Sequence, residues 1–384
     1  MKTTKLKATA VAPSNIAFVK YWGKRDEALN IPFNGSISMN LSSLLTTTTV
    51  EFSPSFKEDL ISINRDYIET SQLRHSGERQ RLQNLSSSSL RQVRDSGRVL
   101  PRLRSGSLAR MTGFEVSSDQ NGQDEIQRII EHLDRVRALA KINYRAKVVT
   151  KNNFPTSTGL SSSASGFAAL TLAASKAAGL NLSEKELSIL ARQGSGSACR
   201  SIPDGFVEWL DGDTNETSYS VSLYPPNYWE IVDVVTIVSK NKKEIATSQG
   251  QKLANSSLFF AVRLKRIKEK TQAIKKYMKI KNFKEFGELI EQEALELHAI
   301  MLTSTPPLIY WLPGTLRIMY AVKKWRQEGL QVYFTVNTGQ DIHLICQKKD
   351  QELVVKKAKK ISDVQNAIIN YPSKGARIVP EDLF

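Results

Sequence analysis

The stretch NNFPTSTGLSSSASG, residues 152–166, places the strongest constraint on the fold. It lies between a strand-like run, INYRAKVVTK, and an alanine-rich segment that predicts a helix over 161–178. A glycine- and serine-rich turn that opens a helix brings backbone N–H donors, hydroxyls and the positive helix end to one point. This arrangement favours a phosphate site, and a plain serine-capped helix start is the alternative. It is not a Walker A loop, because no Gly-Lys-Ser/Thr appears in it.

Individual residues of this loop suit that role. Gly159 permits close approach of the backbone to a ligand. The hydroxyls of Ser162 and Ser163 can bond a phosphate or ligate Mg²⁺, the ion that accompanies ATP.

Two other stretches have the chemistry of anion sites. APSNIAFVKYWGK (12–24) sets Lys20 and Lys24 around an aromatic pair, and on an extended strand Lys20 and Trp22 would share one face. RQGSGSACRS (192–201) combines flexible glycines and serines with the fork-shaped guanidinium of Arg200. The alternatives are an edge strand with surface lysines and an ordinary glycine-terminated helix.

The order of periodic segments predicts an α+β protein with two halves, 1–205 and 206–384. Alternation over the first fifty residues indicates strands, and residues 124–140 place their apolar side chains on one helical face. Ser183 and Glu186 form a capping-box pattern. The second half contains predicted helices over 256–281 and 283–300 and a hairpin-like pair in QVYFTVNTGQDIHLICQ.

Residues 65–123 interrupt this pattern with ten arginines, no lysine and four consecutive serines. A loop of this length without periodicity is rare inside a compact domain. Three hypotheses remain: a disordered basic insertion, an accessory nucleic-acid arm, or an aberrant sequence such as a compensated frameshift. The composition favours disorder or aberrant sequence, because it cannot bury enough surface to offset the ordering entropy.

Composition restricts the possible partners. The net charge is 54 − 38 = +16, but the basic stretch 263–281 has the spacing of an amphipathic helix with a solvated face. With no nucleic-acid motif and no long apolar segment, we predict neither a nucleic-acid nor a membrane partner. Two cysteines and four scattered histidines give no metal-ligand spacing, and the start of the chain does not resemble a signal peptide. These features predict a cytoplasmic protein.

The three motifs APSNIAFVKYWGK, NNFPTSTGLSSSASG and GSGSACRS, in this order, closely resemble the diphosphomevalonate decarboxylases of the GHMP kinase superfamily. The resemblance covers about residues 8–63 and 124–384, and resumes in KKEIATSQGQ (242–251), LHAIMLTSTPPLIYW (297–311) and YFTVNTGQD (333–341). It implies a GHMP-kinase-like two-layer α/β fold, with a ribosomal S5 domain 2-like N-terminal half, a ferredoxin-like C-terminal half and a deep cleft between them. It also implies a homodimer.

The same resemblance implies an enzyme that uses ATP and Mg²⁺ to phosphorylate the tertiary hydroxyl of mevalonate 5-diphosphate. Phosphate and CO₂ then leave, which gives isopentenyl diphosphate. Arg200 would pair with the substrate carboxylate, and Lys20 would lie beside the catalytic position at residue 337. The implied substrate-binding residues are Tyr21, Lys24, Thr150, Asn152, Ser195, Ser197, Arg200 and Thr247. The implied ATP-binding residues are Gly159, Leu160, Ser161, Ser162, Ser163 and Ser165, with Ser162 and Ser163 also near Mg²⁺.

The chain departs from the family at its catalytic carboxylate. The family has an Asp where this chain has Asn337, and an amide cannot accept a proton as a carboxylate does. Asp341 lies four residues further on, where the family has Asn. The departure leaves open an altered natural variant, a substitution that traps substrate, or chemistry that needs little base assistance.

The sequence leaves three alternative functions open. One is a kinase or decarboxylase that acts at the 3-hydroxyl of mevalonate or its 5-phosphate. Another is a catalytically impaired variant, and a third is a silent protein that binds nucleotide or RNA.

Overall fold

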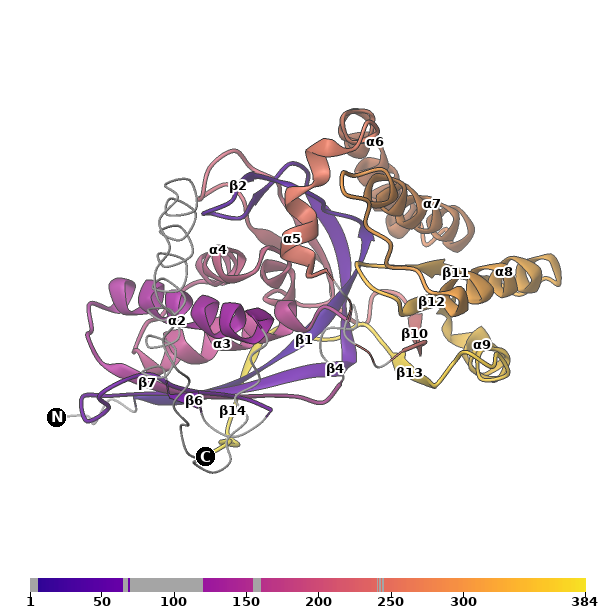
Figure 1. The fold of residues 1–384 in the computed structure, drawn as a ribbon. Coiled ribbons are helices and arrows are strands. Elements are labelled where there is room, and N and C mark those ends of the chain that lie inside the picture. The colour runs from indigo at the N-terminus through magenta and orange to yellow at the C-terminus, as the bar shows by residue number, and fades with distance from the viewer. Residues whose placement is uncertain are drawn as a thin grey trace, which may run out of the picture.

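The computed structural model describes residues 6–64, 68–69, 120–154, 160–239, 241, 243 and 245–384, with backbone only for 68–69 and 120–122. It is an α+β structure with a large mixed sheet and a smaller antiparallel sheet, both packed against helices (Figure 1). The hypotheses for segment 65–123 lie outside the described residues, apart from 68–69 and 120–123.

The large sheet is built on β1 (Lys7–Val19) and β4 (Ser36–Ser53), which pair antiparallel along most of their length. Its main path runs β14-β1-β4-β7-β5-β6, and the β8–β9 hairpin pairs with β4 beside this path. The other strands of this sheet are β5 (Leu60–Ile63), β6 (Ile68–Glu69), β7 (Arg145–Asn152), β8 (Phe206–Trp209), β9 (Ser220–Tyr224) and β14 (Arg377–Val379).

Three helices cover one face of this sheet: α2 (Gln120–Ala140), α3 (Ser162–Ala177) and α4 (Glu184–Gly194) (Figure 1). The alanine-rich α3 lies against the sheet because small side chains let a helix approach strands closely. Its buried residues join those of β1, β4 and β7 in one apolar core.

The smaller sheet has the order β11-β12-β10-β13 and is packed on both faces. Along β10, Ile231 and Val235 pack with α6 and α7, whereas Val232 and Val234 pack with α8 and α9, as the two-residue period of a strand requires. The bounds are β10 (Ile231–Ile237), β11 (Val332–Thr335), β12 (Ile342–Gln347), β13 (Asn366–Asn370), α6 (Phe260–Lys279), α7 (Phe283–Leu302), α8 (Pro313–Gln327) and α9 (Gln351–Ala358). The short elements are β2 (Lys24–Asp26), β3 (Ile31–Pro32), α5 (Thr247–Lys252), η1 (Gly196–Ser201), η2 (Ala254–Ser256) and η3 (Lys348–Asp350).

Strands β1 and β4 each contribute to two apolar cores. Ala10 and Val50 belong to the core beneath α3, while Ile16 and Met39 of the same strands belong to the core shared with α6 and α7. The side chains that these strands carry toward the candidate site are therefore fixed relative to both cores.

Most of the predicted elements are confirmed with small shifts at their ends. The helix predicted over 124–140 begins earlier, at Gln120, and Gly179 ends the α3 region with a positive φ of 77°. The capping box of Ser183 and Glu186 is present, and β11 and β12 form the expected hairpin. The helices predicted over 256–281 and 283–300 correspond to α6 and α7.

The prediction that a strand continues through Lys20 to Trp22 is wrong. β1 ends at Val19, and both Lys20 and Trp22 are buried, with exposed fractions of 2% and 1%. The strand ends because the peptide groups of Lys20 bond to side chains: its N–H donates to Glu293 and its carbonyl accepts from Arg263.

None of the helices in the described part of the chain is long and apolar enough to cross a membrane. The buried, apolar α3 has 16 residues, fewer than the roughly 20 that a helix needs to span a bilayer.

Candidate functional site

Arg200, in η1, presents a buried guanidinium beside the end of β1. It is 4% exposed, and it donates from Nη2 to Asn15 Oδ1 at 2.9 Å and from Nη1 to Ser36 Oγ at 2.8 Å. Among the described residues, the side chains that bond to it offer neutral oxygens rather than carboxylates. Since a buried charge is stable only when it is paired or well hydrogen-bonded, this cation is suited to pair with an incoming anion.

A chain of hydrogen bonds joins Lys20 to the predicted phosphate loop. Lys20 Nζ donates to Asn337 Oδ1 at 3.1 Å, and Asn337 Nδ2 donates to Ser161 Oγ at 3.2 Å. Lys20 Nζ also donates to the carbonyl of Ala17 at 2.6 Å. Asn337 therefore lies between the buried lysine and the start of α3. Asp341 does not take its place, because its Oδ1 accepts from Val238 N at 2.9 Å.

The start of α3 is held against β1 and η1. Ser14 Oγ donates to the carbonyl of Leu160 at 2.5 Å, and Ser195 Oγ donates to Ser163 Oγ at 3.4 Å. Ser161 precedes the helix in a left-handed conformation, with φ of 58°. The loop and the arginine-bearing segment thus share one side of the molecule. Gly159 lies outside the described residues, so its part in the loop stays a prediction.

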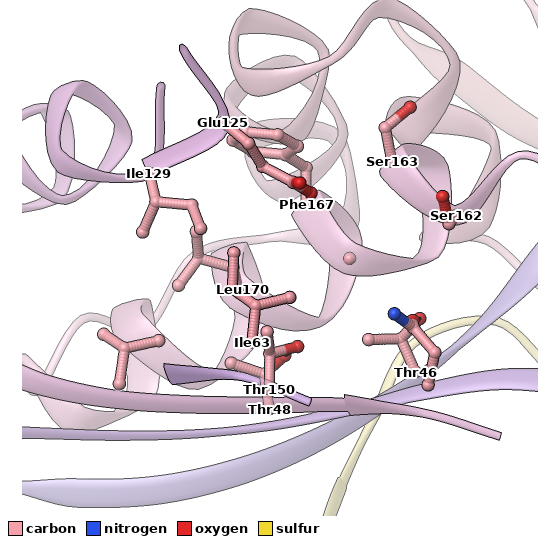
Figure 2. A pocket seen from close by; sticks show the side chains of 13 residues that line it. Thr46, Thr48, Ile63, Glu125, Ile129, Thr150, Ser162, Ser163, Phe167 and Leu170 are labelled. Atoms are coloured by element: carbon pink, nitrogen blue, oxygen red, sulfur yellow. Dashed lines mark hydrogen bonds between the residues drawn. The ribbon is translucent and has the colours of Figure 1, made fainter. Parts of the chain in front are cut away.

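A partly open cavity lies beside this helix start (Figure 2). Figure 2 shows Ser162 and Ser163 on α3 above the threonines of the sheet. Thr150 and Asn152 of β7 also line the cavity, so both predicted residues face the helix start. Ser165 bonds instead to the sheet, through Thr46 Oγ1 at 2.6 Å. Further lining side chains come from Thr46, Thr48, Ile63, Glu125, Ile129, Val148, Phe167 and Leu170.

Three other predicted substrate residues lie in or near α5: Tyr21 in the loop after β1, Lys24 at the start of β2 and Thr247 at the start of α5. Tyr21 Oη bonds to Gln251, and burial raises the pKa of Tyr21, so its hydroxyl stays protonated. Lys24 Nζ pairs with Glu27 at 3.3 Å. Thr247 Oγ1 accepts a hydrogen bond from Lys243 Nζ at 2.6 Å.

Lys20 and Lys243 both have perturbed pKa values because they are buried. Desolvation lowers the pKa of Lys20 to about 7, with Glu293 acting to raise it and Arg200 and Arg263 acting to lower it. Desolvation also lowers the pKa of Lys243 to about 8. Amines that titrate near neutrality gather at functional sites, because burial is tolerated there for the sake of chemistry.

The sequence did not single out several residues that complete this site: Asn15 and Ser36, which hold Arg200, Lys243 beside Thr247, and Glu293 beneath Lys20. Asn15 and Lys243 lie within stretches already noted, but their type alone gives no signal. Glu293 lies in an amphipathic helix, where sequence indicates only a surface acid.

The described residues contain no group of three or more His, Cys, Asp or Glu side chains arranged to hold a metal ion. A metal at this site would therefore take most of its ligands from hydroxyl oxygens and from the phosphates of a bound nucleotide.

Comparison with protein families gives matches to both halves of the chain. Residues 12–95 and 107–220 match the diphosphomevalonate decarboxylase-like N-terminal domain, and residues 233–379 match the mevalonate 5-diphosphate decarboxylase C-terminal domain. The diphosphomevalonate decarboxylase of Candida albicans is 32% identical over 91% of this chain and 86% of its own length. The enzyme of that name from Bos taurus is 33% identical over 86% of this chain and 74% of its own.

Solved structures agree over nearly the whole chain. The mevalonate diphosphate decarboxylase of Staphylococcus aureus superposes with a TM-score of 0.79 at 32% identity, covering 97% of this chain and 98% of its own. A structure described as MDDEF in complex with MVAPP, AMPPCP and magnesium gives a TM-score of 0.78 at 30% identity, with the same coverage.

Proposed function

This chain belongs to the diphosphomevalonate decarboxylase family, and we propose that it performs this family's reaction by binding mevalonate 5-diphosphate and ATP in one cationic cleft. The activity is that of an ATP-dependent decarboxylase in the mevalonate pathway of isoprenoid synthesis. ATP phosphorylates the 3-hydroxyl, and loss of phosphate and CO₂ then gives isopentenyl diphosphate.

The observation that carries this proposal is the hydrogen-bond chain Lys20–Asn337–Ser161. The reaction needs two polyanions face to face, and mutual repulsion must be offset by fixed cations and oriented donors. These hydrogen bonds connect the buried amine of Lys20 to Ser161, the residue before α3. Ser195 connects the same helix to the segment that carries Arg200. These contacts support binding of the two anions next to each other, on either side of Asn337.

ATP is assigned to the start of α3 and its cavity. Leu160, Ser161, Ser162 and Ser163 surround the positive end of the helix, where phosphate oxygens are favoured. Ser162 and Ser163 fit Mg²⁺, because their hydroxyls and the carboxylate of Glu125 line one cavity and Mg²⁺ prefers oxygen ligands shared with phosphates. Bound there, the ion would neutralise charge on the transferring phosphoryl group.

The substrate is assigned to the opposite side of Asn337. Arg200 pairs with its carboxylate, and Ser195 and Ser197 of the same segment bond its oxygens. Tyr21, Lys24 and Thr247 receive its diphosphate. Thr150 and Asn152, which share a cavity with Ser162 and Ser163, contact the region where the two molecules meet.

Asn337 determines how the hydroxyl is activated. Its amide cannot take the hydroxyl proton, so phosphoryl transfer here relies on positioning and on a loose transition state with charge spread over the three equatorial phosphoryl oxygens. The hydroxyl proton stays on the alcohol until the new P–O bond has largely formed and then passes to an oxygen of the transferred phosphoryl group. Lys20 stabilises that charge as an ammonium. Its Nζ donates to Ala17 and Asn337, and the third hydrogen of an ammonium remains for an incoming oxygen.

A second candidate function, on the same fold, is phosphorylation of the 3-hydroxyl without decarboxylation. Incubation with ATP, Mg²⁺ and mevalonate 5-diphosphate should release ADP and CO₂ in equal amounts if the proposed function holds. ADP without CO₂ would identify a kinase, and neither product would identify a silent binding protein. Mevalonate 5-phosphate in place of the diphosphate tests the need for the second phosphate.

The pH dependence of this reaction should report the charge of Lys20. Because its pKa is lowered to about 7, the ammonium form is lost as pH rises through that value, and kcat/KM should fall there. Bound anions favour the ammonium, so the corresponding limb of kcat should lie at higher pH.

Lys20→Arg keeps the positive charge at every accessible pH and should remove this limb, although turnover is lower. If the alkaline fall of kcat/KM were unchanged in Lys20→Arg, a group other than Lys20 would be responsible for it.

The cytoplasmic location, the homodimer and the division at residues 205 and 206 stay predictions.

A further inference from the structure

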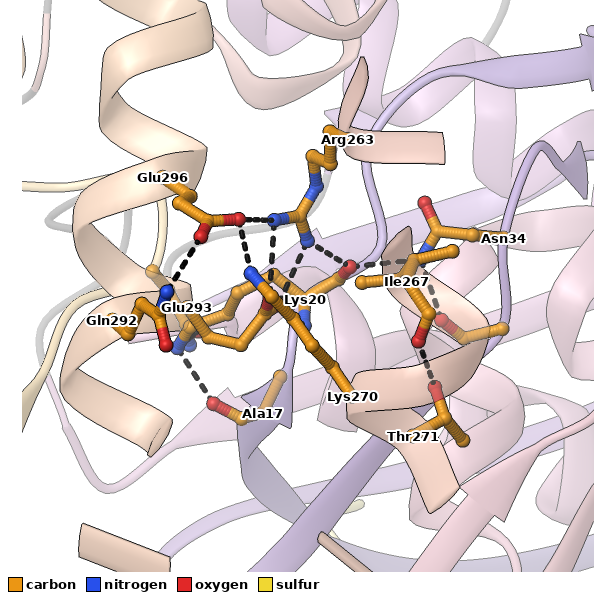
Figure 3. Close-up of polar contacts among 12 residues, drawn as sticks. Ala17, Lys20, Asn34, Arg263, Ile267, Lys270, Thr271, Gln292, Glu293 and Glu296 are labelled. Atoms are coloured by element: carbon orange, nitrogen blue, oxygen red, sulfur yellow. Dashed lines mark hydrogen bonds and ion pairs between the residues drawn. The ribbon is translucent and has the colours of Figure 1, made fainter. Parts of the chain in front are cut away.

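A buried cluster of charged side chains packs against the backbone of Lys20 (Figure 3). Glu293 of α7 is fully buried and accepts from Arg263 Nη2 at 2.8 Å and from Lys270 Nζ at 3.0 Å, both on α6. Glu296, one turn further along α7, bonds to Lys270 and lies 3.8 Å from Arg263 Nη1. The two acids and two bases form one network between the paired helices.

The network forms hydrogen bonds with both the backbone N–H and the backbone carbonyl of Lys20. Lys20 N donates to Glu293 Oε2 at 3.1 Å, and Arg263 Nη2 donates to the carbonyl of Lys20 at 2.8 Å. That carbonyl also accepts from Asn34 Nδ2 at 2.9 Å. β1 has ended one residue earlier, so these side-chain bonds replace the sheet ladder at the residue whose amine reaches Asn337.

Stability alone gives a weak reason for such a cluster. Buried ion pairs seldom improve on apolar residues of the same volume, because removing charges from water costs much of the Coulomb gain. Burial raises the pKa of Glu293, but Arg263 and Lys270 outweigh it and hold that pKa below its usual value, so the carboxylate stays ionised. A permanent, immobile negative charge is thus maintained beneath Lys20.

Among the charged groups near Lys20, few besides Glu293 favour its protonated form. Asp233 of β10 is the second acid that favours the ammonium, while Arg200 of η1 and Arg263 of α6 oppose it. His298 of α7 bonds to the carbonyl of Asn337, and burial lowers its pKa to about 3, so it is neutral at physiological pH. The neighbour bonded to the amine, Asn337, is uncharged.

We propose that Glu293 is a positioning residue for the reaction: clamped by Arg263 and Lys270, it fixes the Lys20 peptide so that Nζ meets Asn337, and it supplies the negative charge that Asn337 lacks. The inference rests on the proposed function for its kinetic consequence, but the titration of Lys20 can be measured without any turnover.

The decisive comparison is Glu293→Gln against Glu296→Gln. Both remove one carboxylate from the same network, but only Glu293 bonds to Lys20. Glu293→Gln keeps an oxygen acceptor and loses the charge, so the pKa of Lys20 should fall by roughly one unit or more. The alkaline limb of kcat/KM should move to lower pH by the same amount, while Glu296→Gln leaves both within about 0.3 unit, as expected for a partner that does not face Lys20.

Glu293→Asp separates position from charge. The carboxylate remains, but the side chain is one methylene shorter. Because a misplaced catalytic group lowers the rate, kcat should fall at least about tenfold, with only a small shift of the alkaline limb of kcat/KM.

The pKa of Lys20 is read from ¹³C NMR of protein labelled at lysine Cε, with its signal assigned by its absence in Lys20→Arg. Thermal unfolding of each variant checks the fold, and Glu293→Asp carries the test if Glu293→Gln does not fold.

Equal shifts in Glu293→Gln and Glu296→Gln would overturn the inference, as would a Lys20 pKa unchanged in both. If the wild-type protein releases neither ADP nor CO₂, the proposed function fails. The NMR titration still decides whether Glu293 sets the charge of Lys20.

Discussion

Replacing Asn337 with aspartate is expected to raise kcat for decarboxylation by at least about 10²-fold, the usual contribution of a well-placed general base. The new carboxylate would lie where the amide oxygen now accepts from Lys20 Nζ at 3.1 Å. An ion pair there would keep Lys20 protonated to higher pH and leave the second carboxylate oxygen for the substrate hydroxyl. Ser161, which now accepts from Asn337, can reverse its hydroxyl and donate instead.

The measurement is CO₂ release at saturating ATP and substrate, over a range of pH. The alkaline limb should move upward in Asn337→Asp, because the added charge favours the ammonium form. Asn337→Ala is the matched control: it removes the acceptor of Lys20 without adding a base, and should lower kcat. A similar kcat in wild type and Asn337→Asp would refute general-base assistance at this position.

Replacing Arg200 with glutamine should lower kcat/KM for mevalonate 5-diphosphate by about 10²-fold. The guanidinium is held by Asn15 and Ser36, and the loss of one charge-assisted hydrogen-bonding partner is worth about 3 kcal/mol. The effect should appear mainly in the KM of the mevalonate substrate and in the yield of CO₂, with little change in the Kd of ATP. Calorimetric titration with each ligand separates these effects.

Arg192→Lys supplies a control matched for burial. Arg192 is fully buried and donates to the carbonyls of Leu29 and Asn215, so its replacement should lower the unfolding temperature without raising KM selectively. If Arg200→Gln changed the Kd of ATP as much as the KM of the mevalonate substrate, Arg200 would not be the partner of the substrate carboxylate.

The sequence predicted the elements and motifs well where local chemistry determines structure. The helix after residue 161, the capping box of Ser183 and the β11–β12 hairpin follow from caps, glycine and periodicity, which act over a few residues. The order of three dense motifs is enough to recognise the family without knowledge of tertiary contacts.

The same local rules failed at Lys20. Alternation predicts a strand through Trp22, but Glu293 and Arg263, more than 240 residues away in sequence, take over the peptide groups. No pattern in the sequence around Lys20 indicates a hydrogen-bonding partner that distant in the chain. The proximity of Asn337 to Ser161 is equally non-local, since it depends on how β11 meets the start of α3. Sequence therefore predicted candidate residues for the chemistry, such as Lys20 and Asn337, and missed side chains that hold them, such as Glu293.

The continuity of β1 and β4 through both apolar cores limits how this enzyme can enclose its substrates. Two domains joined by a flexible linker can rotate toward each other as rigid bodies, but paired strands that contribute side chains to both cores resist such bending. We therefore expect any movement on ligand binding to occur in segments outside these two strands. Asn15 of β1 and Ser36 of β4, which hold the Arg200 guanidinium, are therefore expected to keep their spacing without a rearrangement in each turnover.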